Sequence, residues 1–493
     1  MHSLKAFLVD LTYKVEGDKP VILLFCRTAE GKRVCIRDRN FEPYFVVTAP
    51  AECVPKIHAL SVSEDGVLYR VIRVEAREVN IRERSTTAYH VFCNIPKAVA
   101  KLRDLARGIP EVTGVYEDDI LFVRRYVIDK KVMPLSLVEA HGEFVDDSVM
   151  RIPVFEAAHI EPVAGIERLS PKVLAFDIET YYQPSSRGID FQKNPILSIS
   201  LYGDGIQKCI TWKKFPSADN RILFAENEAG MIRTFVELVN AYAPDVITGY
   251  NSDGFDFPYL VKRASLLKTA LDLGADGSPV RMLGTTNPQA EISGIAHVDV
   301  FKFIRHVMMR SLKTDVFTLD AVSAEVLGDR KIEVDLDKLH EAWDAAAPDL
   351  QRYMDYNIHD SKLTYDLCRT YWPSMLEFVQ LIGLPLVDVT RMSFSTLVEW
   401  FIIKKAVSAG EVILSKPKNT DERKRMRQQV KGGFVLEPTP GVYTNIAVFD
   451  YRSLYPSIIA SHNISLGTLG CDCCRETGRV PTDRGDFWFC TKK

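Results

Sequence analysis

Two acidic residues that share one face of a strand are the first candidates for chemistry. They are Asp177 and Glu179, which lie near the end of KVLAFDIET, a run typical of a buried strand. Residues two positions apart on a strand point to the same side, so both carboxylates project together. Such a pair is costly in a protein interior unless a cation neutralises it. The pattern therefore indicates a cation site at this strand end.

Two further segments supply matching side chains. Asp256 follows a phenylalanine at a loop-to-helix junction in TGYNSDGFDFPYL, and YNIHDSKLTYDL carries Tyr356 and Asp360. The last two are four residues apart and so share one helix face. Four carboxylates and a tyrosine hydroxyl are the parts of a two-metal phosphodiesterase site, where cations activate water and stabilise the leaving oxygen. Ligation by oxygen alone favours Mg²⁺ or Mn²⁺ over zinc.

The elements that must position these side chains follow an α/β pattern. From about residue 171, buried strands alternate with helices, which predicts a mostly parallel or mixed sheet covered on both faces. Residues 1 to about 135 are strand-rich, with one short amphipathic helix in IPKAVAKLRDLARGIP. Residues 376–415 look helical throughout, and NIAVFD (445–450) is expected to be a strand.

The three acidic segments resemble the Exo I, Exo II and Exo III motifs of DEDDy-type 3′→5′ proofreading exonucleases. Their order after a β-rich region is similar to that of family B DNA polymerases, particularly the archaeal ones. The resemblance implies an RNase H-like exonuclease domain with two Mg²⁺ or Mn²⁺ ions in each active site. Asp177, Glu179 and Asp360 would hold the metals directly, and Asp256 would reach them directly or through water.

The same resemblance implies roles for three more residues. Tyr356 would orient the attacking water, and Asn251 and Phe255 would contact the single-stranded 3′ end of DNA.

A second chemical element lies at 447–465, AVFDYRSLYPSIIASHNIS, and is similar to motif A of the family. By that resemblance Asp450 is one of two palm carboxylates that bind catalytic Mg²⁺. Backbone amides around Ser453 and Leu454 would touch the triphosphate at a helix N-terminus. Tyr455 would stack beneath the sugar and exclude a 2′-hydroxyl.

The segment VKGGFV (430–435) resembles the Y-x-G-G segment, which contacts template backbone in this family. Gly432 and Gly433 would allow close approach to phosphate. Val430 stands where the tyrosine is usual, which predicts an altered balance between synthesis and editing.

The N-terminal region resembles the template pocket with which archaeal family B enzymes stall on uracil. The residues that align with the walls of that pocket are Tyr13, Pro43, Val99, Arg103 and Phe122. Recognition of deaminated template bases is the hypothesis that follows.

The predicted fold class is a multidomain α/β and α+β protein. A β-rich template-binding domain is expected over 1–136, with helices in 372–413 as candidates to complete it. An RNase H-like exonuclease domain is expected over 137–371. Residues 414–493 are expected to form the first part of a palm domain, which is incomplete. Neither the K-x₃-N-S-x-Y-G pattern of the fingers nor the D-T-D of the palm occurs in the sequence. Truncation is the favoured explanation for the absence of these two patterns. The other two explanations are a split polymerase, whose second chain supplies them, and an intein-interrupted gene.

These features predict a DNA-directed DNA polymerase of family B with a 3′→5′ proofreading exonuclease. The 493-residue chain itself is expected to degrade DNA and not to synthesise it. Expected partners are primer–template DNA, a single-stranded 3′ end, deoxynucleoside triphosphates, and a sliding clamp or second polymerase chain. The alternatives are a stand-alone DNA-repair exonuclease and a template-binding subunit of a split polymerase.

Composition limits the way in which the chain can bind DNA. The formal net charge is −3, so binding must rest on local basic patches. No apolar run approaches the ~18 residues of a membrane span, and a cytoplasmic, nucleoid-associated location in a prokaryote is expected.

The ten cysteines fall into two groups. Six lie in apolar contexts and are expected in the core: Cys26, Cys35, Cys53, Cys93, Cys209 and Cys368. The other four lie near the end of the sequence: Cys471, Cys473, Cys474 and Cys490. For this second group a closed zinc site, a disulfide and free thiols are all open.

Overall fold

The computed structural model describes most of the chain, namely residues 2–163, 165, 170–183, 190–417, 423–424, 433–482 and 485–492. The chain divides into two compact units. Unit 1 consists of Met1–Pro43, Asn94–Pro96 and Ile120–Lys405, and unit 2 consists of Tyr44–Cys93, Lys97–Asp119 and Ala406–Lys493.

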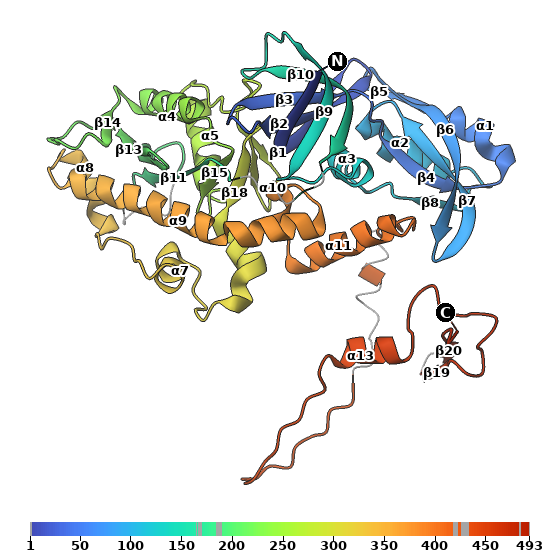
Figure 1. Cartoon of the computed structure of the whole chain (residues 1–493). Coiled ribbons are helices and arrows are strands. Elements are labelled where there is room, and N and C mark those ends of the chain that lie inside the picture. Colours follow the sequence, from blue (N-terminus) through green and yellow to red (C-terminus); the bar gives the residue numbers. More distant parts are fainter. Residues whose placement is uncertain are drawn as a thin grey trace. The chain divides into compact units, whose positions relative to one another are not determined.

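A closed five-stranded barrel forms the first part of unit 1 (Figure 1). Its strands, in order around the barrel, are β1 (His2–Glu16), β2 (Lys19–Arg27), β3 (Arg33–Asp38), β10 (Val154–Pro162) and β9 (Leu137–Val145). All pairs are antiparallel except β10 with β3. Buried side chains such as Leu24, Ile36 and Phe155 fill its interior. Helix α3 (Phe122–Lys130) covers this core with Tyr126, whose hydroxyl donates to Asp38.

The barrel takes in residues on both sides of the sequence-based boundary at 136. Strands β9 and β10 lie after that boundary, yet each pairs with strands from the first 40 residues. Local sequence patterns do not show which distant strands will pair, so the sequence could not reveal these barrel strands. The predicted domain boundaries stay predictions.

A six-stranded mixed sheet forms the second part of unit 1, as predicted. Its order is β14 (Ile222–Phe224), β13 (Ile206–Thr211), β12 (Ile196–Gly203), β11 (Val173–Thr180), β15 (Val246–Gly249) and β18 (Ala296–Asp299). Strands β12 with β11 and with β13 are antiparallel, and the other pairs are parallel.

Helices cover both faces of this sheet. Helices α4 (Glu228–Tyr242) and α5 (Asp256–Leu266) share one apolar core with alternate residues of β11, which include Phe176 and Ile178. The 33-residue helix α9 (Leu350–Ile382) packs along β11 and β12 on the other face (Figure 1). Asp177 and Glu179 alternate with the core residues of β11, so they face α9.

Most of the remaining elements of unit 1 are short, and the longest of them is the 15-residue α11 (Phe394–Ser408), whose last three residues belong to unit 2. The others are hairpin β16 (Arg281–Leu283) and β17 (Gln289–Glu291), helices α6 (Val300–Phe303), α7 (Leu319–Val326), α8 (Leu339–Asp344) and α10 (Leu386–Val389), π-helix η2 (Ile304–Met308), and 3₁₀ turns η3 (Met309–Ser311) and η4 (Leu336–Lys338). The expectation of a continuous helix over 376–415 was wrong, because α9 ends at Gly383 with a left-handed φ of 77°.

Unit 2 contains a five-stranded sheet. In order, its strands are β5 (Ser61–Glu64), β6 (Val67–Ile81), β7 (Arg84–Cys93), β4 (Tyr44–Thr48) and β8 (Gly114–Tyr116), with η1 (Ala51–Cys53), α1 (Val54–His58) and α2 (Pro96–Arg107) beside them in sequence. After residue 433 come helix α13 (Leu454–Ser461) and hairpin β19 (Arg479–Thr482) with β20 (Gly485–Trp488).

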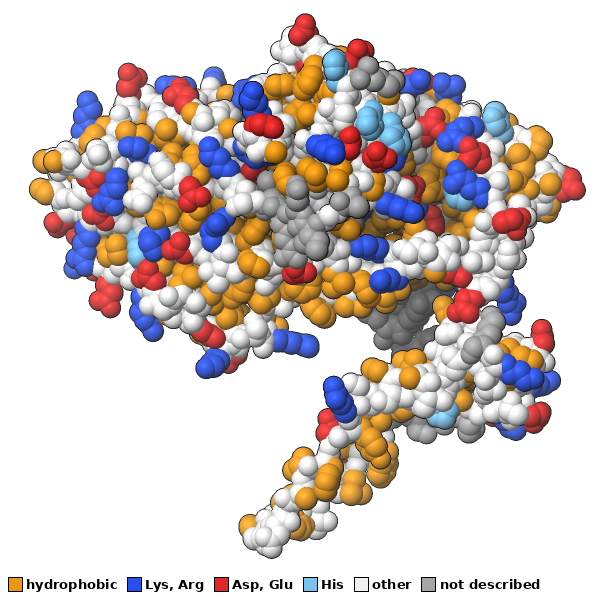
Figure 2. Space-filling view, in the orientation of Figure 1, with side chains coloured by type: hydrophobic (Ala, Val, Ile, Leu, Met, Phe, Trp, Pro, Cys, Tyr) orange, Lys and Arg blue, Asp and Glu red, His pale blue; other side chains and the backbone are white. Residues whose placement is uncertain are grey.

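The expected strand at 445–450 does not form. Residues 445–450 have no strand geometry, and Val448 and Phe449 are 90% and 91% exposed. In Figure 2, hydrophobic side chains (orange) are uncovered on the extended segment at the bottom of the view. A strand depends on partner strands and a core to cover its apolar face, and the described residues supply neither to this segment.

In the described part of the chain, no helix has the length and apolar character needed to cross a bilayer.

Candidate active site

The structure brings the exonuclease-motif carboxylates together in unit 1. Asp177 and Glu179 project from β11 and Asp360 from α9, and one oxygen of each lies within 4.8 Å of the others. Asp256, the first residue of α5, accepts a hydrogen bond from the backbone N–H of Ile178 at 3.3 Å. Four acids from three elements therefore meet at the end of β11.

Asn357 fixes the orientation of one of these acids. Its amide Nδ2 donates to Asp177 Oδ2 at 2.8 Å, while its Oδ1 accepts from the Ser198 hydroxyl at 3.2 Å. Asn357 is fully buried on the face of α9 that meets the sheet. Asn357 was not predicted from the sequence, although its position beside Tyr356 in the motif was a usable signal.

The four carboxyl groups are held where ionisation is unfavourable. Burial raises the pKa of Glu179 to about 8 and that of Asp256 to about 7. Burial also raises the pKa of Asp177 and Asp360, and for Asp177 the charges of Asp256, Asp360 and Glu179 add to the effect. A positive charge at this point would relieve all four shifts.

The donor set fits a divalent cation. The buried Oδ1 of Asp360 has no hydrogen-bond partner among the described residues. An unsatisfied buried carboxylate oxygen is costly, and a hard cation prefers ligands of this type. Asp177, Glu179 and Asp360 could hold such an ion, with Asp256 beside them.

Lys331 is a functional candidate that the sequence analysis did not find. Its ammonium forms an ion pair with Asp360 and donates to the Tyr356 hydroxyl at 2.6 Å. Although burial opposes its charge, Asp360, Tyr356 and Asp177 raise the pKa of Lys331 above its usual range. It lies in a loop about 25 residues before its partners, so no local spacing pointed to it.

The loop between β15 and α5 presents Asn251 and Phe255. Asn251 is exposed and has a left-handed φ of 63°, while Phe255 packs its ring 5.5 Å from that of Tyr259. A Cβ at Gly254 would come within 2.6 Å of the Asn251 side-chain oxygen, so a larger residue there would displace the Asn251 side chain. Asp299 holds the loop by accepting from the backbone N–H of Asn251 at 2.9 Å.

A buried ionic cluster supports the same loop. Asp253 is fully buried, and its Oδ2 accepts a hydrogen bond from Arg391 Nε at 2.8 Å. The Lys302 ammonium lies 3.0 Å from the same oxygen. His297 lies 3.3 Å from the same carboxylate and donates or accepts at Ser252. Despite burial, His297 and Arg391 hold the pKa of Asp253 well below its usual range. This cluster was not predicted from the sequence.

The motif A residues all lie in unit 2. Asp450 is exposed, and Leu454 and Tyr455 open helix α13. Ser453 precedes the helix with a left-handed φ of 55° and accepts from the Ser457 N–H. Within the described residues, no cluster of potential metal ligands includes Asp450.

The candidate template contacts are only partly described. Val430 and Gly432 lie outside the described residues, whereas Gly433 is exposed and a Cβ there would meet no atom within 4 Å.

The proposed uracil-pocket residues are divided between the two units. In unit 1 the rings of Tyr13 and Phe122 pack edge to face at 5.3 Å, and Pro43 is buried. In unit 2 Val99 and Arg103 lie one turn apart on α2, where Arg103 forms an ion pair with Asp118 at 2.8 Å.

Two family models match this chain. Residues 113–322 match the exonuclease domain of DNA polymerase family B, and residues 384–488 match DNA polymerase family B. The DNA polymerase of Pyrococcus glycovorans is 34% identical over 482 residues, which cover 97% of this chain and 57% of the relative. The DNA polymerase of Thermococcus sp. (strain 9oN-7) is 35% identical over 479 residues, which cover 96% of this chain and 56% of that relative.

A solved structure agrees with these relatives. The family B DNA polymerase from the hyperthermophilic archaeon Pyrobaculum calidifontis has a TM-score of 0.78 and 29% identity, covering 99% of this chain and 61% of that one. The chain thus spans a little over half the length of the polymerases just named. The matched segments include Asp177, Glu179, Asp256 and Asp450. From its motifs, its fold and these matches, the chain belongs to DNA polymerase family B.

Proposed function

We propose that unit 1 carries a 3′→5′ exonuclease that removes nucleotides from the single-stranded 3′ end of DNA. The observation that carries this proposal is the convergence of Asp177, Glu179 and Asp360 within 4.8 Å, with Asp256 beside them. We propose two Mg²⁺ or Mn²⁺ ions as the cofactor, which would supply an activated water and a stabilised leaving oxygen.

The residues of the chain have separate tasks in this mechanism. Asp177, with its carboxylate held by Asn357, and Glu179 bind cations on the strand side of the site. Tyr356 presents its hydroxyl from α9, and Lys331 fixes that hydroxyl through a 2.6 Å hydrogen bond. The tyrosine can then orient a water for in-line attack on the terminal phosphodiester.

The loop after β15 would hold the DNA strand. Exposed Asn251 can donate to a base or a sugar, and the half-buried ring of Phe255 can pack against a terminal base. The buried cluster around Asp253 fixes both positions before DNA arrives, which lowers the entropy cost of binding.

For the whole protein we propose template-directed DNA synthesis. Asp450 would be one of its metal-binding carboxylates, the backbone at Ser453 and Leu454 would meet the triphosphate, and Tyr455 would exclude ribonucleotides. Gly432 and Gly433 would contact the template. The partners are primer–template DNA and deoxynucleoside triphosphates. Identities of 34% and 35% to two polymerases along nearly the whole chain support this proposal.

The exonuclease proposal can be tested with a single-stranded oligonucleotide labelled at its 5′ end. In Mg²⁺ or Mn²⁺ the chain should shorten it from the 3′ end one nucleotide at a time. The double variant Asp177→Ala, Glu179→Ala should lose this activity but still bind DNA, whereas Glu237→Gln, an exposed change on α4, should keep it. Degradation that survives the double change would refute the proposed site.

We also propose that Tyr13, Pro43, Val99, Arg103 and Phe122 each contribute to the recognition of deaminated template bases. Single strands that differ only in uracil or thymine would be compared by fluorescence anisotropy. Tighter binding of the uracil strand is expected, and its reduction by Tyr13→Ala would link it to these residues. Equal affinity for the two strands would exclude the proposal.

A further inference from the structure

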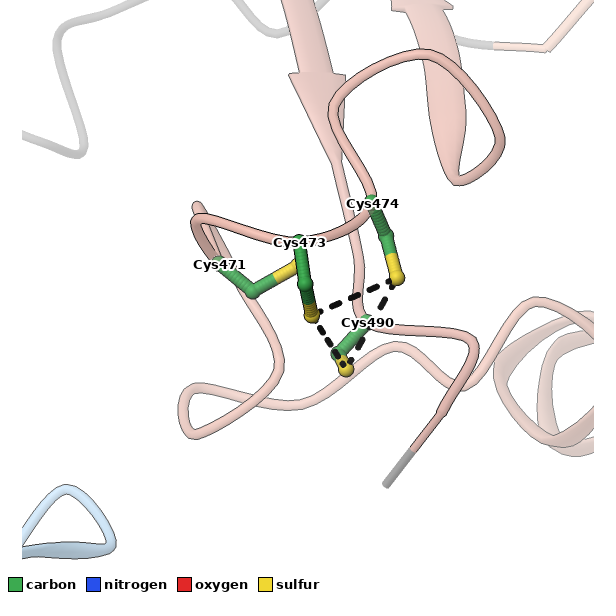
Figure 3. A group of neighbouring side chains, drawn as sticks. All are labelled: Cys471, Cys473, Cys474 and Cys490. Carbon is green, nitrogen blue, oxygen red and sulfur yellow. Dashed lines mark hydrogen bonds between the residues drawn. The ribbon is translucent and has the colours of Figure 1, made fainter.

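The four cysteines at the end of the sequence converge on one point in unit 2 (Figure 3). Their sulfur atoms all lie within 4.8 Å of one another. The Sγ atoms of Cys473 and Cys474 are 3.5 Å apart, those of Cys473 and Cys490 are 3.7 Å apart, and those of Cys474 and Cys490 are 4.0 Å apart. Cys471 is the fourth member, and its sulfur also lies within 4.8 Å of the other three.

These separations match one tetrahedral metal ion. Zinc binds thiolate sulfur at about 2.3 Å, so the sulfurs of a regular tetrahedral site are about 3.8 Å apart. The three separations of 3.5, 3.7 and 4.0 Å lie on either side of that value. A disulfide would use only two of the four thiols and would give the other two no reason to converge.

Polar donors surround the buried sulfur of Cys474. The backbone N–H and the hydroxyl of Thr491 both lie 3.4 Å from this Sγ and donate to it. Hydrogen bonds of this kind stabilise a metal-bound thiolate and orient it. The indole N–H of Trp488 donates to the Cys471 carbonyl at 2.7 Å, which holds the Cys471 loop against β20.

The described residues around the cysteines form almost no apolar core of their own. Leu466, Leu469 and Phe487 are all exposed, while Cys474 and Cys490 are nearly fully buried. A chain segment that cannot bury enough apolar surface usually needs a metal or a cross-link to hold its fold. The sulfurs therefore occupy the place that a hydrophobic core would otherwise fill.

We propose that Cys471, Cys473, Cys474 and Cys490 bind one structural Zn²⁺ ion. All four positions of the tetrahedron are taken by thiolates, so the site is closed and has no catalytic position. It is separate from the carboxylates of the exonuclease site and independent of their role.

The zinc ion would fix hairpin β19–β20 to the end of motif A. The Asn463 side chain, just after α13, donates to the Cys490 carbonyl at 2.7 Å, and the Cys490 N–H donates to Thr468 at 2.8 Å. Because Cys490 is both a proposed ligand and a partner of these residues, the ion restrains the chain that follows Tyr455. The site thus stabilises the C-terminal end of the helix that motif A begins.

The test uses the 493-residue chain, purified under reducing conditions from cells grown with zinc. Elemental analysis by mass spectrometry is expected to find about one Zn²⁺ per chain. Replacement by Co²⁺ should give the intense visible absorption of a tetrahedral thiolate site. Cys473→Ser, the exposed position, should lose most of the zinc, while Cys53→Ala, a cysteine elsewhere in unit 2, should retain it.

Three results would overturn the proposal. The first is a folded wild-type chain without zinc, and the second is a Cys474–Cys490 or Cys473–Cys490 disulfide in that chain under the same conditions. The third is a full zinc content in both Cys473→Ser and Cys471→Ser. The measurements on the wild-type chain decide the question even where a variant fails to fold.

Discussion

Neutralising Glu179 should stabilise the metal-free chain while it destroys the metal site. The Glu179 carboxylate lies within 4.8 Å of an Asp360 oxygen, and two charges at that separation repel by about 3.5 kcal/mol at an effective dielectric constant of about 20. Lys331 and solvent offset part of this repulsion. We therefore expect Glu179→Gln to raise the unfolding free energy by about 1–2 kcal/mol.

This gain must depend on pH in a defined direction. Burial and Asp360 raise the pKa of folded Glu179 to about 8, from about 4.5 in the unfolded chain. Between these values the folded chain holds a proton that the unfolded chain releases, so wild-type stability falls as pH rises. Glu179→Gln should then match wild type near about pH 5 and exceed it most above about pH 8.

Scanning calorimetry in EDTA measures the effect. A gain of 1 kcal/mol corresponds to roughly 2–4 °C in the melting temperature of a domain of this size, so about 2–8 °C is expected near pH 9. Added Mn²⁺ should raise the melting temperature of wild type and leave that of Glu179→Gln nearly unchanged. The matched control is Glu237→Gln, which should follow wild type throughout. A variant less stable than wild type at about pH 9 would refute the reasoning.

Three further predictions concern residues around this site. Lys331→Met removes a cation that repels divalent ions from Asp360, so we expect Mn²⁺ to bind about tenfold more tightly near pH 9, as measured by titration calorimetry. Weaker Mn²⁺ binding by this variant would contradict the assigned contact between Lys331 and Asp360. Tyr356→Phe should slow single-turnover degradation of single-stranded DNA by about 10²-fold while the Mn²⁺-induced rise in melting temperature is unchanged, and a lost metal response would instead make the tyrosine structural. Arg391→Met leaves the Asp253 carboxylate buried without its guanidinium, so urea unfolding should show a loss of about 3–5 kcal/mol, restored in part by adding Asp253→Asn; a loss below about 1 kcal/mol would exclude a tight pair.

Local patterns predicted the parts of the site that lie on regular elements. Alternation along β11 placed Asp177 and Glu179 on one face, and spacing along α9 did the same for Tyr356 and Asp360. Both periods are properties of the backbone, so they hold before any tertiary contact forms.

Lys331 and Arg391 were beyond such reasoning. Each reaches its partner from an irregular segment, Lys331 after α7 and Arg391 after α10, so proximity depends on how distant elements pack. The barrel strands β9 and β10 were hidden for the same reason. The prediction of a strand at 445–450 was wrong for a related reason. A sequence with high β-propensity does not form a strand when it has no partner strands.

The bond between Arg391 and Asp253 bears on how the exonuclease can be separated from the rest of the chain. The carboxylate sits in the loop that presents Asn251, and its guanidinium partner lies 138 positions later. A polypeptide that stopped at residue 371 would contain the four acids of the proposed exonuclease site, but the buried Asp253 carboxylate beneath the Asn251 loop would lose its guanidinium and keep only Lys302 and His297 as partners. During synthesis, too, that loop can reach its final form only after residue 391 has left the ribosome. The proposed exonuclease site therefore depends for its final structure on Arg391, a residue outside the proposed catalytic set.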